Sequence, residues 1–140
     1  MIREATPSDL PLIVDLGRRF YAATGQPGVW NDQSVWGFCG NLIATPGQTI
    51  LVSQQGMIGG VIVPLYWDHE YLLAHEAFWW SEDRQGRHLL EAFEAWARAH
   101  GAREVHMSLL SGQREKAVRR VLVGMGYAAP DEQRMVKKWQ

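Results

Sequence analysis

The sequence predicts an α+β domain built on a mixed, mostly antiparallel sheet. Segments with apolar residues at helical spacing alternate with shorter segments rich in strand-forming residues, in the order β-α-α-β-β-β-α-β-α-β. One predicted helix joins two strands that are expected to be neighbours, which requires a parallel crossover. The 140 residues contain no linker, repeat or low-complexity tract, so a single domain spanning 1–140 is expected.

The first three predicted elements are a strand and two helices. Ile2–Ala5 forms the strand, and either Ser8 or Thr6 caps the first helix. Ser8 is favoured because it places Pro11 in the first turn, where proline is tolerated. A glycine- and proline-containing segment at 25–28 ends this helix, and a second amphipathic stretch follows it.

The middle of the chain predicts a hairpin and a central strand. Thr49–Ser53 and Met57–Tyr66 are the hairpin strands, and Gly59-Gly60 indicates a bulge or a close backbone contact. Tyr71–Trp80 is apolar on both faces, as expected of a strand inside the sheet. The four residues before it, 67–70, are expected to form a loop.

The last four predicted elements alternate between helix and strand. Gly86–His100 has a clear buried stripe and is the best-defined helix. It is followed by a strand at Val105–Leu109, a helix at Gln113–Met125 and a closing strand at Gln133–Trp139. The helix between Tyr71–Trp80 and Val105–Leu109 is the predicted crossover.

Composition excludes several classes of function. A net charge of −1 lacks the basic surface of a nucleic-acid-binding protein, and no apolar run reaches the roughly 18–20 residues of a membrane span. A charged N-terminus without a signal peptide and a single cysteine, Cys39, indicate a cytoplasmic protein. No Cys, His and carboxylate spacing predicts a metal site.

Seven tryptophans are unusual for a chain of this length. Large aromatic residues most simply form the core, and Trp96 is assigned there because it lies on the buried stripe of its helix. Trp30 and Trp36 are compatible with the core and also with a ligand slot or a partner-binding face. A tryptophan-rich surface would support a homodimer or a larger assembly.

Three segments resemble the GNAT superfamily of N-acetyltransferases in their order and spacing. They are the opening at 2–11, the helix at 86–97 and the glycine motif at 124–127 before a basic closing segment. The resemblance spans essentially the whole chain. The segment Glu76–Trp80 is also similar to short GNAT-like proteins of phages and prophages. The implied fold is that of an acyl-CoA N-acyltransferase.

The resemblance implies a binding site for acetyl-CoA. The pantetheine arm would lie along the strand near Phe78, Trp79 and Trp80, where that strand separates from its parallel neighbour. The pyrophosphate would bind the loop and first helical turn formed by Arg84, Gln85, Gly86 and Arg87. Amide groups at a helix N-terminus are suited to anions because they lack partners and lie at the positive end of the helix dipole.

Two departures from the family pattern bear on this site. In the phosphate loop, Ser81 and Arg84 replace the usual amide or basic residue and the middle glycine, and Glu82 and Asp83 add negative charge. The loop is therefore expected to weaken acetyl-CoA binding. The position of the family's thiolate-protonating tyrosine is occupied by Leu122, so this acid is missing unless Tyr127 or a water replaces it.

Glu76 is the candidate catalytic base. It lies in an apolar strand, where desolvation raises the pKa of a carboxyl group toward neutrality. His75 is the alternative, because a shift of one residue along a strand exchanges the side chain that faces the cleft. Structural roles for the same residues would be an ion pair between Glu76 and an arginine, and a core position for His75.

Two functions follow from these observations. The first is an acetyl-CoA-dependent N-acetyltransferase that acts on a primary amine of a small molecule or peptide. The second is a catalytically inactive binding or structural protein with the GNAT fold, phage-derived or associated with a virion. The predicted arrangement of elements favours the first function, whereas the acidic loop and Leu122 favour the second.

Overall fold

The structure, a computed structural model, describes residues 1–110, 112 and 114–139. Within it the chain divides into two compact units, Met1–Ser108 and Leu109–Gln140. The first unit contains the whole sheet and three helices, and the second contains one helix.

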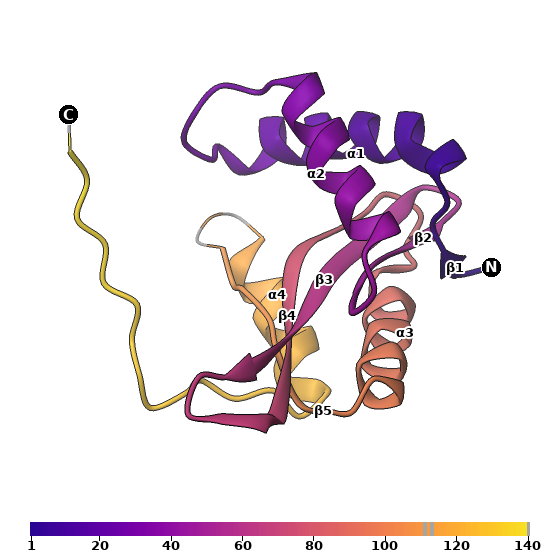
Figure 1. The fold of residues 1–140 in the computed structure, drawn as a ribbon. Coiled ribbons are helices and arrows are strands. Elements are labelled where there is room, and N and C mark those ends of the chain that lie inside the picture. The colour runs from indigo at the N-terminus through magenta and orange to yellow at the C-terminus, as the bar shows by residue number, and fades with distance from the viewer. Residues whose placement is uncertain (111, 113, 140) are drawn as a thin grey trace. The chain divides into compact units, whose positions relative to one another are not determined.

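Five strands form a mixed sheet in the order β1-β2-β3-β4-β5 (Figure 1). They are β1 (Arg3–Glu4), β2 (Gln48–Ser53), β3 (Gly56–Leu65), β4 (Asp68–Ser81) and β5 (Ala102–His106). Pairing is antiparallel from β1 to β4 and parallel between β4 and β5. The crossover predicted between the last two strands is confirmed, and so is the α+β class with a mixed sheet.

Helices cover the two faces of this sheet in the first unit. They are α1 (Leu10–Thr24), α2 (Asp32–Ala44) and the crossover helix α3 (Gly86–Ala99). The apolar side chains of α1 and α2 form one cluster with Ile50, Val52 and Met57. Side chains of adjacent strand residues point to opposite faces of the sheet. Leu51 and Ile58, both buried, therefore face away from α1 and α2. The core therefore lies in two layers around β2 and β3.

The start of α1 differs from its predicted capping. A single 3₁₀ turn at Pro7–Asp9 precedes the helix; Thr6 is the N-cap of this turn and Asp9 is the N-cap of α1, so Ser8 caps neither. The Thr6 amide donates to the Asp9 carboxylate at 2.8 Å, and Arg3 donates both terminal nitrogens to the same carboxylate at 2.7 and 2.8 Å. Ser8 was the expected cap because it would place Pro11 in the first turn of the helix. Instead, the carboxylate of Asp9, three residues after Thr6, accepts a hydrogen bond from the Thr6 amide.

Replacing Asp9 with asparagine is expected to destabilise the protein in a pH-dependent way. The Arg3 hydrogen bonds lower the pKa of Asp9 to about 2 from 3.8. A lowered carboxyl pKa stabilises the fold above the unfolded-state pKa and stops doing so as pH falls through 2. Because Arg3 is half-exposed, we expect Asp9→Asn to lower the free energy of unfolding by about 1–2 kcal/mol at pH 7. This difference should disappear near pH 2. Urea unfolding of both proteins across this range measures the difference.

The Gly59-Gly60 pair lies at a β-bulge, as predicted. Gly59 pairs with Phe78 but Gly60 pairs with Glu76, so Ala77 on β4 is the extra residue. A methyl group on Gly60 would lie 2.4 Å from the Phe93 ring and 2.6 Å from the His75 carbonyl oxygen. Glycine is required here because α3 and β4 approach the backbone too closely for any side chain.

Two predicted elements differ in the structure. Residues 68–70, expected as a loop, begin β4, because Asp68 pairs with Leu65 across a tight turn. The closing strand expected at Gln133–Trp139 does not form within the described residues, and Met135, Val136 and Trp139 are exposed. A strand needs a neighbouring edge for its backbone hydrogen bonds, and the residues of the segment itself cannot supply one.

The second unit contains α4 (Glu115–Gly124). This helix lies inside the span predicted from Gln113, a residue outside the described part of the chain. Within the unit, the Tyr127 amide donates to the Leu122 carbonyl at 3.0 Å and closes the end of the helix. None of the helices in the described residues has both the length and the apolar character needed to cross a bilayer.

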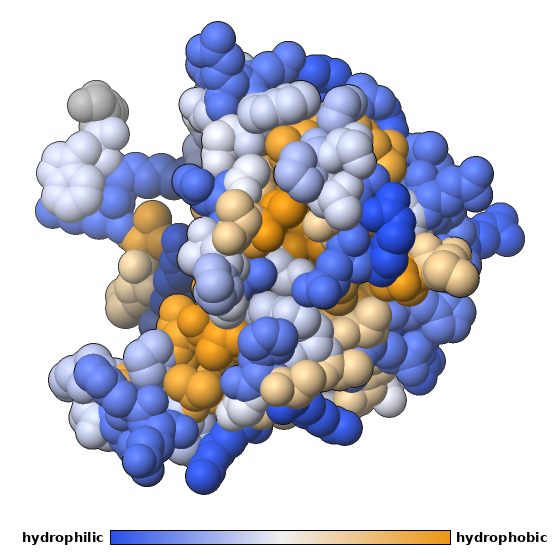
Figure 2. Space-filling view, turned by 45° about the vertical axis from the view of Figure 1, so that its right-hand side comes forward, coloured by the Kyte–Doolittle hydropathy of each residue, from blue (hydrophilic) through white to orange (hydrophobic). Residues whose placement is uncertain are grey.

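The tryptophans divide between interior and surface. Trp96 is 9% exposed, which confirms its core position, whereas Trp36, Trp67 and Trp139 are 47%, 69% and 81% exposed. The surface in Figure 2 is mostly hydrophilic, with apolar side chains reaching it in a few patches. An assembly through exposed tryptophans stays a prediction.

Candidate active site

Strands β4 and β5 pair over only part of their length. Parallel pairing runs from Leu72 with Ala102 to His75 with His106, where β5 ends. Strand β4 continues to Ser81, and over Glu76–Ser81 its only strand partner among the described residues is β3. Among the described residues, this stretch therefore has no neighbouring strand on one of its two edges, beginning at Glu76.

Glu76 lies where the two strands part. Its Oε1 accepts a hydrogen bond from the Ser108 backbone amide at 2.9 Å, which fixes the carboxylate. Burial raises the pKa of Glu76 to about 7 from 4.5, and the Ser108 amide opposes this shift. Within the described part of the chain, Glu76 forms no ion pair with an arginine, so the structural role expected from such a pair is not found there. A carboxyl group that titrates near neutrality is suited to accept a proton.

The raised pKa of Glu76 predicts a stability that falls as pH rises. Below pH 4.5 the group is protonated in both the folded and unfolded states, and above 7 it is charged and desolvated in the folded state. Glu76→Gln keeps the acceptor for Ser108 and removes the charge. We expect the free energy of unfolding of the variant, relative to that of the wild type, to rise by about 2–3 kcal/mol from pH 4.5 to pH 8. Urea unfolding measures this difference. Glu91→Gln, at an exposed position of α3, is expected to show no such trend.

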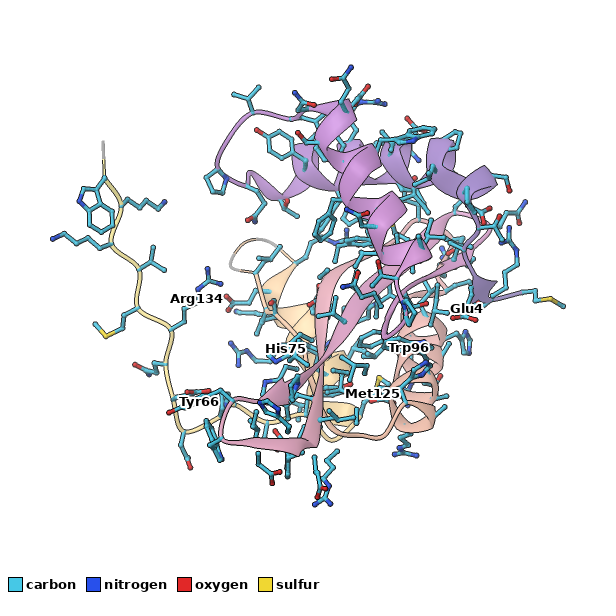
Figure 3. The ribbon with its side chains drawn as sticks, viewed as in Figure 1. Glu4, Tyr66, His75, Trp96, Met125 and Arg134 are labelled. Atoms are coloured by element: carbon cyan, nitrogen blue, oxygen red, sulfur yellow. The ribbon has the colours of Figure 1, made fainter. Side chains whose placement is uncertain are left out.

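His75 takes part in a different contact. Its ring lies against that of His106, with centroids 4.7 Å apart, about half-way along β4 (Figure 3). Burial and the neighbouring His106 lower the pKa of His75, so it is neutral at pH 7. His106 in turn contacts Glu104 at 3.0 Å. His75 thus packs within a histidine pair between β4 and β5.

The three aromatic residues after the bulge have separate contacts. Phe78 lines a cavity described below. The Trp79 indole donates to the Gly86 carbonyl at 2.9 Å, which ties β4 to the start of α3. Trp80 stacks on Phe20 of α1 with centroids 5.3 Å apart. Any role in binding acetyl-CoA would therefore fall to their backbone on the open edge of β4.

The loop between β4 and α3 is held by Asp83. Its carboxylate accepts from the Ser53 hydroxyl, the Gln55 amide and the Ser81 hydroxyl, each at 2.8 Å, and from the Gln85 amide at 3.2 Å. These donors lower the pKa of Asp83 despite burial, so it is ionised. One amide ahead of α3, that of Gln85, is consequently satisfied by side chains.

The second acidic residue of the loop has a cationic partner. Glu82 accepts from the Arg19 guanidinium at 2.9 Å and from the Trp80 indole at 2.8 Å. The pKa of Glu82 is lowered, first by the hydrogen bond from Arg19. The charge of Glu82 is therefore paired with that of Arg19 on α1. From the sequence alone, Glu82 was expected to repel a phosphate group at this loop.

The first turn of α3 remains suited to an anion. Gly86 and Arg87 begin the helix, and Arg84 before them has a left-handed backbone with φ of 62°. A methyl group on Gly86 would make only ordinary contacts, at 3.6 Å or more, so the protein interior does not require glycine there. The amides of Gly86 and Arg87 lie in the first helical turn, where amide groups are suited to an anion.

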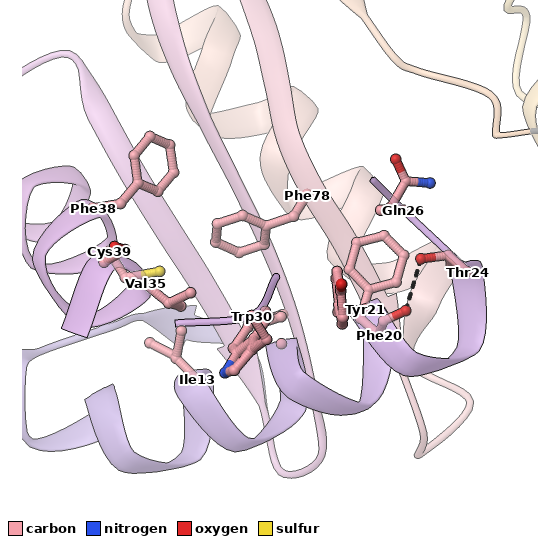
Figure 4. A pocket seen from close by; sticks show the side chains of 13 residues that line it. Ile13, Phe20, Tyr21, Thr24, Gln26, Trp30, Val35, Phe38, Cys39 and Phe78 are labelled. Carbon is pink, nitrogen blue, oxygen red and sulfur yellow. Dashed lines mark hydrogen bonds between the residues drawn. The ribbon is translucent and has the colours of Figure 1, made fainter. Parts of the chain in front are cut away.

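An apolar cavity of about 390 Å³ lies beside this strand and was not predicted from the sequence. Its lining comes from α1, α2, the loop between them, β3 and β4 (Figure 4): Ile13, Gly17, Phe20, Tyr21, Thr24, Gln26, Trp30, Ser34, Val35, Phe38, Cys39, Met57 and Phe78. The ligand slot considered for Trp30 was the only indication of it in the sequence analysis. A cavity assembled from distant segments leaves no local sequence pattern.

Comparison with known proteins supports the fold. No protein-family model and no curated protein matches the sequence significantly. Among solved structures, a Clostridium acetobutylicum protein described as an acetyltransferase, solved with acetyl-CoA, is 14% identical with a TM-score of 0.77, over 98% of this chain and 95% of its own.

Two further structures agree with it. The ribosomal-protein-alanine N-acetyltransferase of Brucella melitensis is 11% identical with a TM-score of 0.67, over 99% of both chains. An aminoglycoside acetyltransferase from an uncultured soil metagenomic sample, in complex with sisomicin, is 15% identical with a TM-score of 0.69, over 100% of this chain and 94% of its own. The chain therefore has the GNAT acetyltransferase fold.

Proposed function

We propose that this chain is an acetyl-CoA-dependent N-acetyltransferase that acts on a primary amine, with Glu76 as the base. The observation that carries the proposal is the separation of β4 from β5 at Glu76, a carboxyl group with a pKa of about 7. The separation leaves a backbone edge for a substrate beside a group able to take a proton.

The residues present fit acetyl-CoA. The open edge of β4 offers backbone donors and acceptors to the amide groups of the pantetheine arm. The amides of Gly86 and Arg87, with the charges of Arg84 and Arg87, would hold the phosphates. The Gln85 amide is already hydrogen-bonded to Ser81 and Asp83, which supports the expectation of weakened binding.

Glu76 would act on the amine before the acetyl group moves. Acetyl-CoA supplies that group as a thioester. The Glu76 carboxylate takes a proton from the ammonium, the nitrogen forms a bond to the carbonyl carbon, and the carbon–sulfur bond breaks. The CoA thiolate leaves with the bonding electrons, and the second proton of the nitrogen passes through water to the sulfur. The products are the N-acetyl amine and CoA.

Calorimetric titration with acetyl-CoA tests the proposal. We expect binding by the wild type and an affinity at least about 10-fold weaker for Gly86→Ala, whose methyl group, beside Ser81 and Trp79, would narrow the approach to the first turn of α3. Gly37→Ala, at an open position of α2, is the matched control and should bind as the wild type does.

The absence of binding would contradict the proposal. A ligand at 100 times its Kd stabilises a protein by about 2.7 kcal/mol, so millimolar acetyl-CoA should also raise the Tm. If neither heat nor a Tm shift is observed, the chain is a GNAT-fold protein with a binding or structural role. Equal affinities of Gly86→Ala and the wild type for acetyl-CoA would show that the phosphates do not bind at the first turn of α3.

A further inference from the structure

Arg19 connects α1 to the loop ahead of α3. Its Nε donates to the two carboxylate oxygens of Glu82 at 2.9 and 3.2 Å, although 63 residues separate the two along the chain. A terminal nitrogen of the same guanidinium donates to Asp15 at 2.5 Å, one turn earlier on α1. The contact with Asp15 fixes the guanidinium to its own helix, and the Nε edge is thereby presented to the loop.

Glu82 is held by two further contacts. Trp80, which stacks on Phe20 of α1, donates its indole N–H to the carboxylate at 2.8 Å, and the Glu82 backbone amide donates to the Gln55 carbonyl at 2.8 Å. The carboxylate is therefore fixed beside α1. Only 30% of the Glu82 side chain is exposed, so water would compensate its charge incompletely if the guanidinium were removed.

The charge of Glu82 lies close to the start of α3. The Gln85 amide donates to the Ser81 hydroxyl at 3.1 Å, and a methyl group on Gly86 would lie 3.6 Å from the Ser81 Cβ. The loop therefore folds back on Ser81, and the next Cα atom, that of Glu82, lies within roughly 10 Å of the Gly86 Cα. This is about the distance over which charges interact at 0.1 M salt.

A diphosphate at the first turn of α3 would be sensitive to this charge. Two like charges about 10 Å apart in water repel each other enough to change an affinity by roughly 2-fold. The diphosphate of acetyl-CoA is a dianion, which doubles the free energy and gives about 4-fold, and the lower effective dielectric constant at a protein surface raises this figure. The positive charge of Arg19, adjoining Glu82, offsets this repulsion.

From these contacts we propose that Arg19 is a positioning residue for acetyl-CoA: it holds and neutralises Glu82, and thereby lets the phosphates bind at the first turn of α3. The inference rests on the proposed function and assigns α1 a part in it. Arg19 acts through Glu82 and does not itself hold the phosphates. The acidic loop, which was expected from the sequence to weaken binding, thus has its countercharge on another element of the fold.

Calorimetric titration with acetyl-CoA at about 20 mM salt tests this role. We expect Arg19→Gln to raise Kd about 5-fold, because it leaves the charge of Glu82 without its cation. Arg19→Lys keeps the positive charge and should stay within about 2-fold of the wild type. Arg18→Gln is the matched control, because Arg18 is the adjacent residue of α1, is similarly exposed and has its ion pairs with Asp15 and Asp32. Its Kd should also stay within about 2-fold.

A double variant separates charge compensation from loop structure. In Arg19→Gln/Glu82→Gln neither charge remains, so Kd should return to the wild-type value or fall below it. At about 0.5 M salt, charges about 10 Å apart are screened, so the ratio of the Arg19→Gln and wild-type Kd values should fall below about 2. Urea unfolding checks that each variant is folded.

The outcomes distinguish this inference from the proposed function. Binding by Arg19→Gln with the wild-type affinity overturns the inference and leaves the transferase standing. A Kd that stays raised in the double variant, at high salt or in Arg19→Lys also overturns it, because the side chain would then shape the loop or contact the phosphates directly. If the wild type and every variant fail to bind acetyl-CoA, the proposed function and the inference are overturned together.

Discussion

Glu76→Gln is expected to lower kcat for acetyl transfer by about 10²- to 10⁴-fold at pH 7, the range measured for loss of a general base. The variant keeps the acceptor for the Ser108 amide, so the local structure is retained and only the proton acceptor is lost. The loss should shrink above the pKa of the amine, where the nucleophile is already neutral. Initial rates from pH 5.5 to 10 measure both effects.

The direction of the pH profile follows from the role of Glu76. A base works in its ionised form, so the wild-type kcat/KM should rise as pH passes through about 7, and this step should be absent in Glu76→Gln. His75→Gln is the matched control, because its neutral ring packs against His106. If the step were lost in His75→Gln and retained in Glu76→Gln, the histidine would be the base.

Gly60→Ala is expected to be the most destabilising single methyl addition in the sheet. The added group would meet both the Phe93 ring and the His75 carbonyl oxygen at under 3 Å. The added methyl group cannot move away from these contacts, because backbone lies on one side of it and a buried ring on the other. We therefore expect the free energy of unfolding to fall by about 3 kcal/mol or more and the Tm by about 10 °C.

A second glycine serves as the control for Gly60. Gly40→Ala, in α2 with open space around it, should be neutral or stabilising by up to about 1 kcal/mol, because alanine favours helix. Differential scanning calorimetry compares the variants. A Tm for Gly60→Ala within about 2 °C of the wild type would show that the bulge adjusts and that β4 is less constrained than its contacts indicate.

Local patterns in the sequence predicted much of the fold. The Gly59-Gly60 pair indicated the bulge, and the buried stripe of 86–100 and its flanking strands indicated the parallel crossover. These features depend on neighbours along the chain or on one steric requirement. The prediction of a strand at Gln133–Trp139 was wrong, because pairing depends on an edge elsewhere in the fold that the residues of this segment cannot reveal.

The site was less accessible to prediction for the same physical reason. The high pKa of Glu76 followed from the apolar character of its strand. The partners of Glu82 and Asp83, however, come from Arg19 and from the turn at Ser53, far away in sequence. The cavity unites two helices and two strands, so it exists only in the folded chain.

The four hydrogen bonds to Asp83 have a consequence for the cost of recognition. They join the β2–β3 turn to the loop ahead of α3 before any ligand arrives. The conformational entropy of ordering that loop is therefore lost when the protein folds and not when a phosphate group binds. For the proposed phosphate site, this preorganisation would offset part of the affinity lost because the Gln85 amide is already hydrogen-bonded.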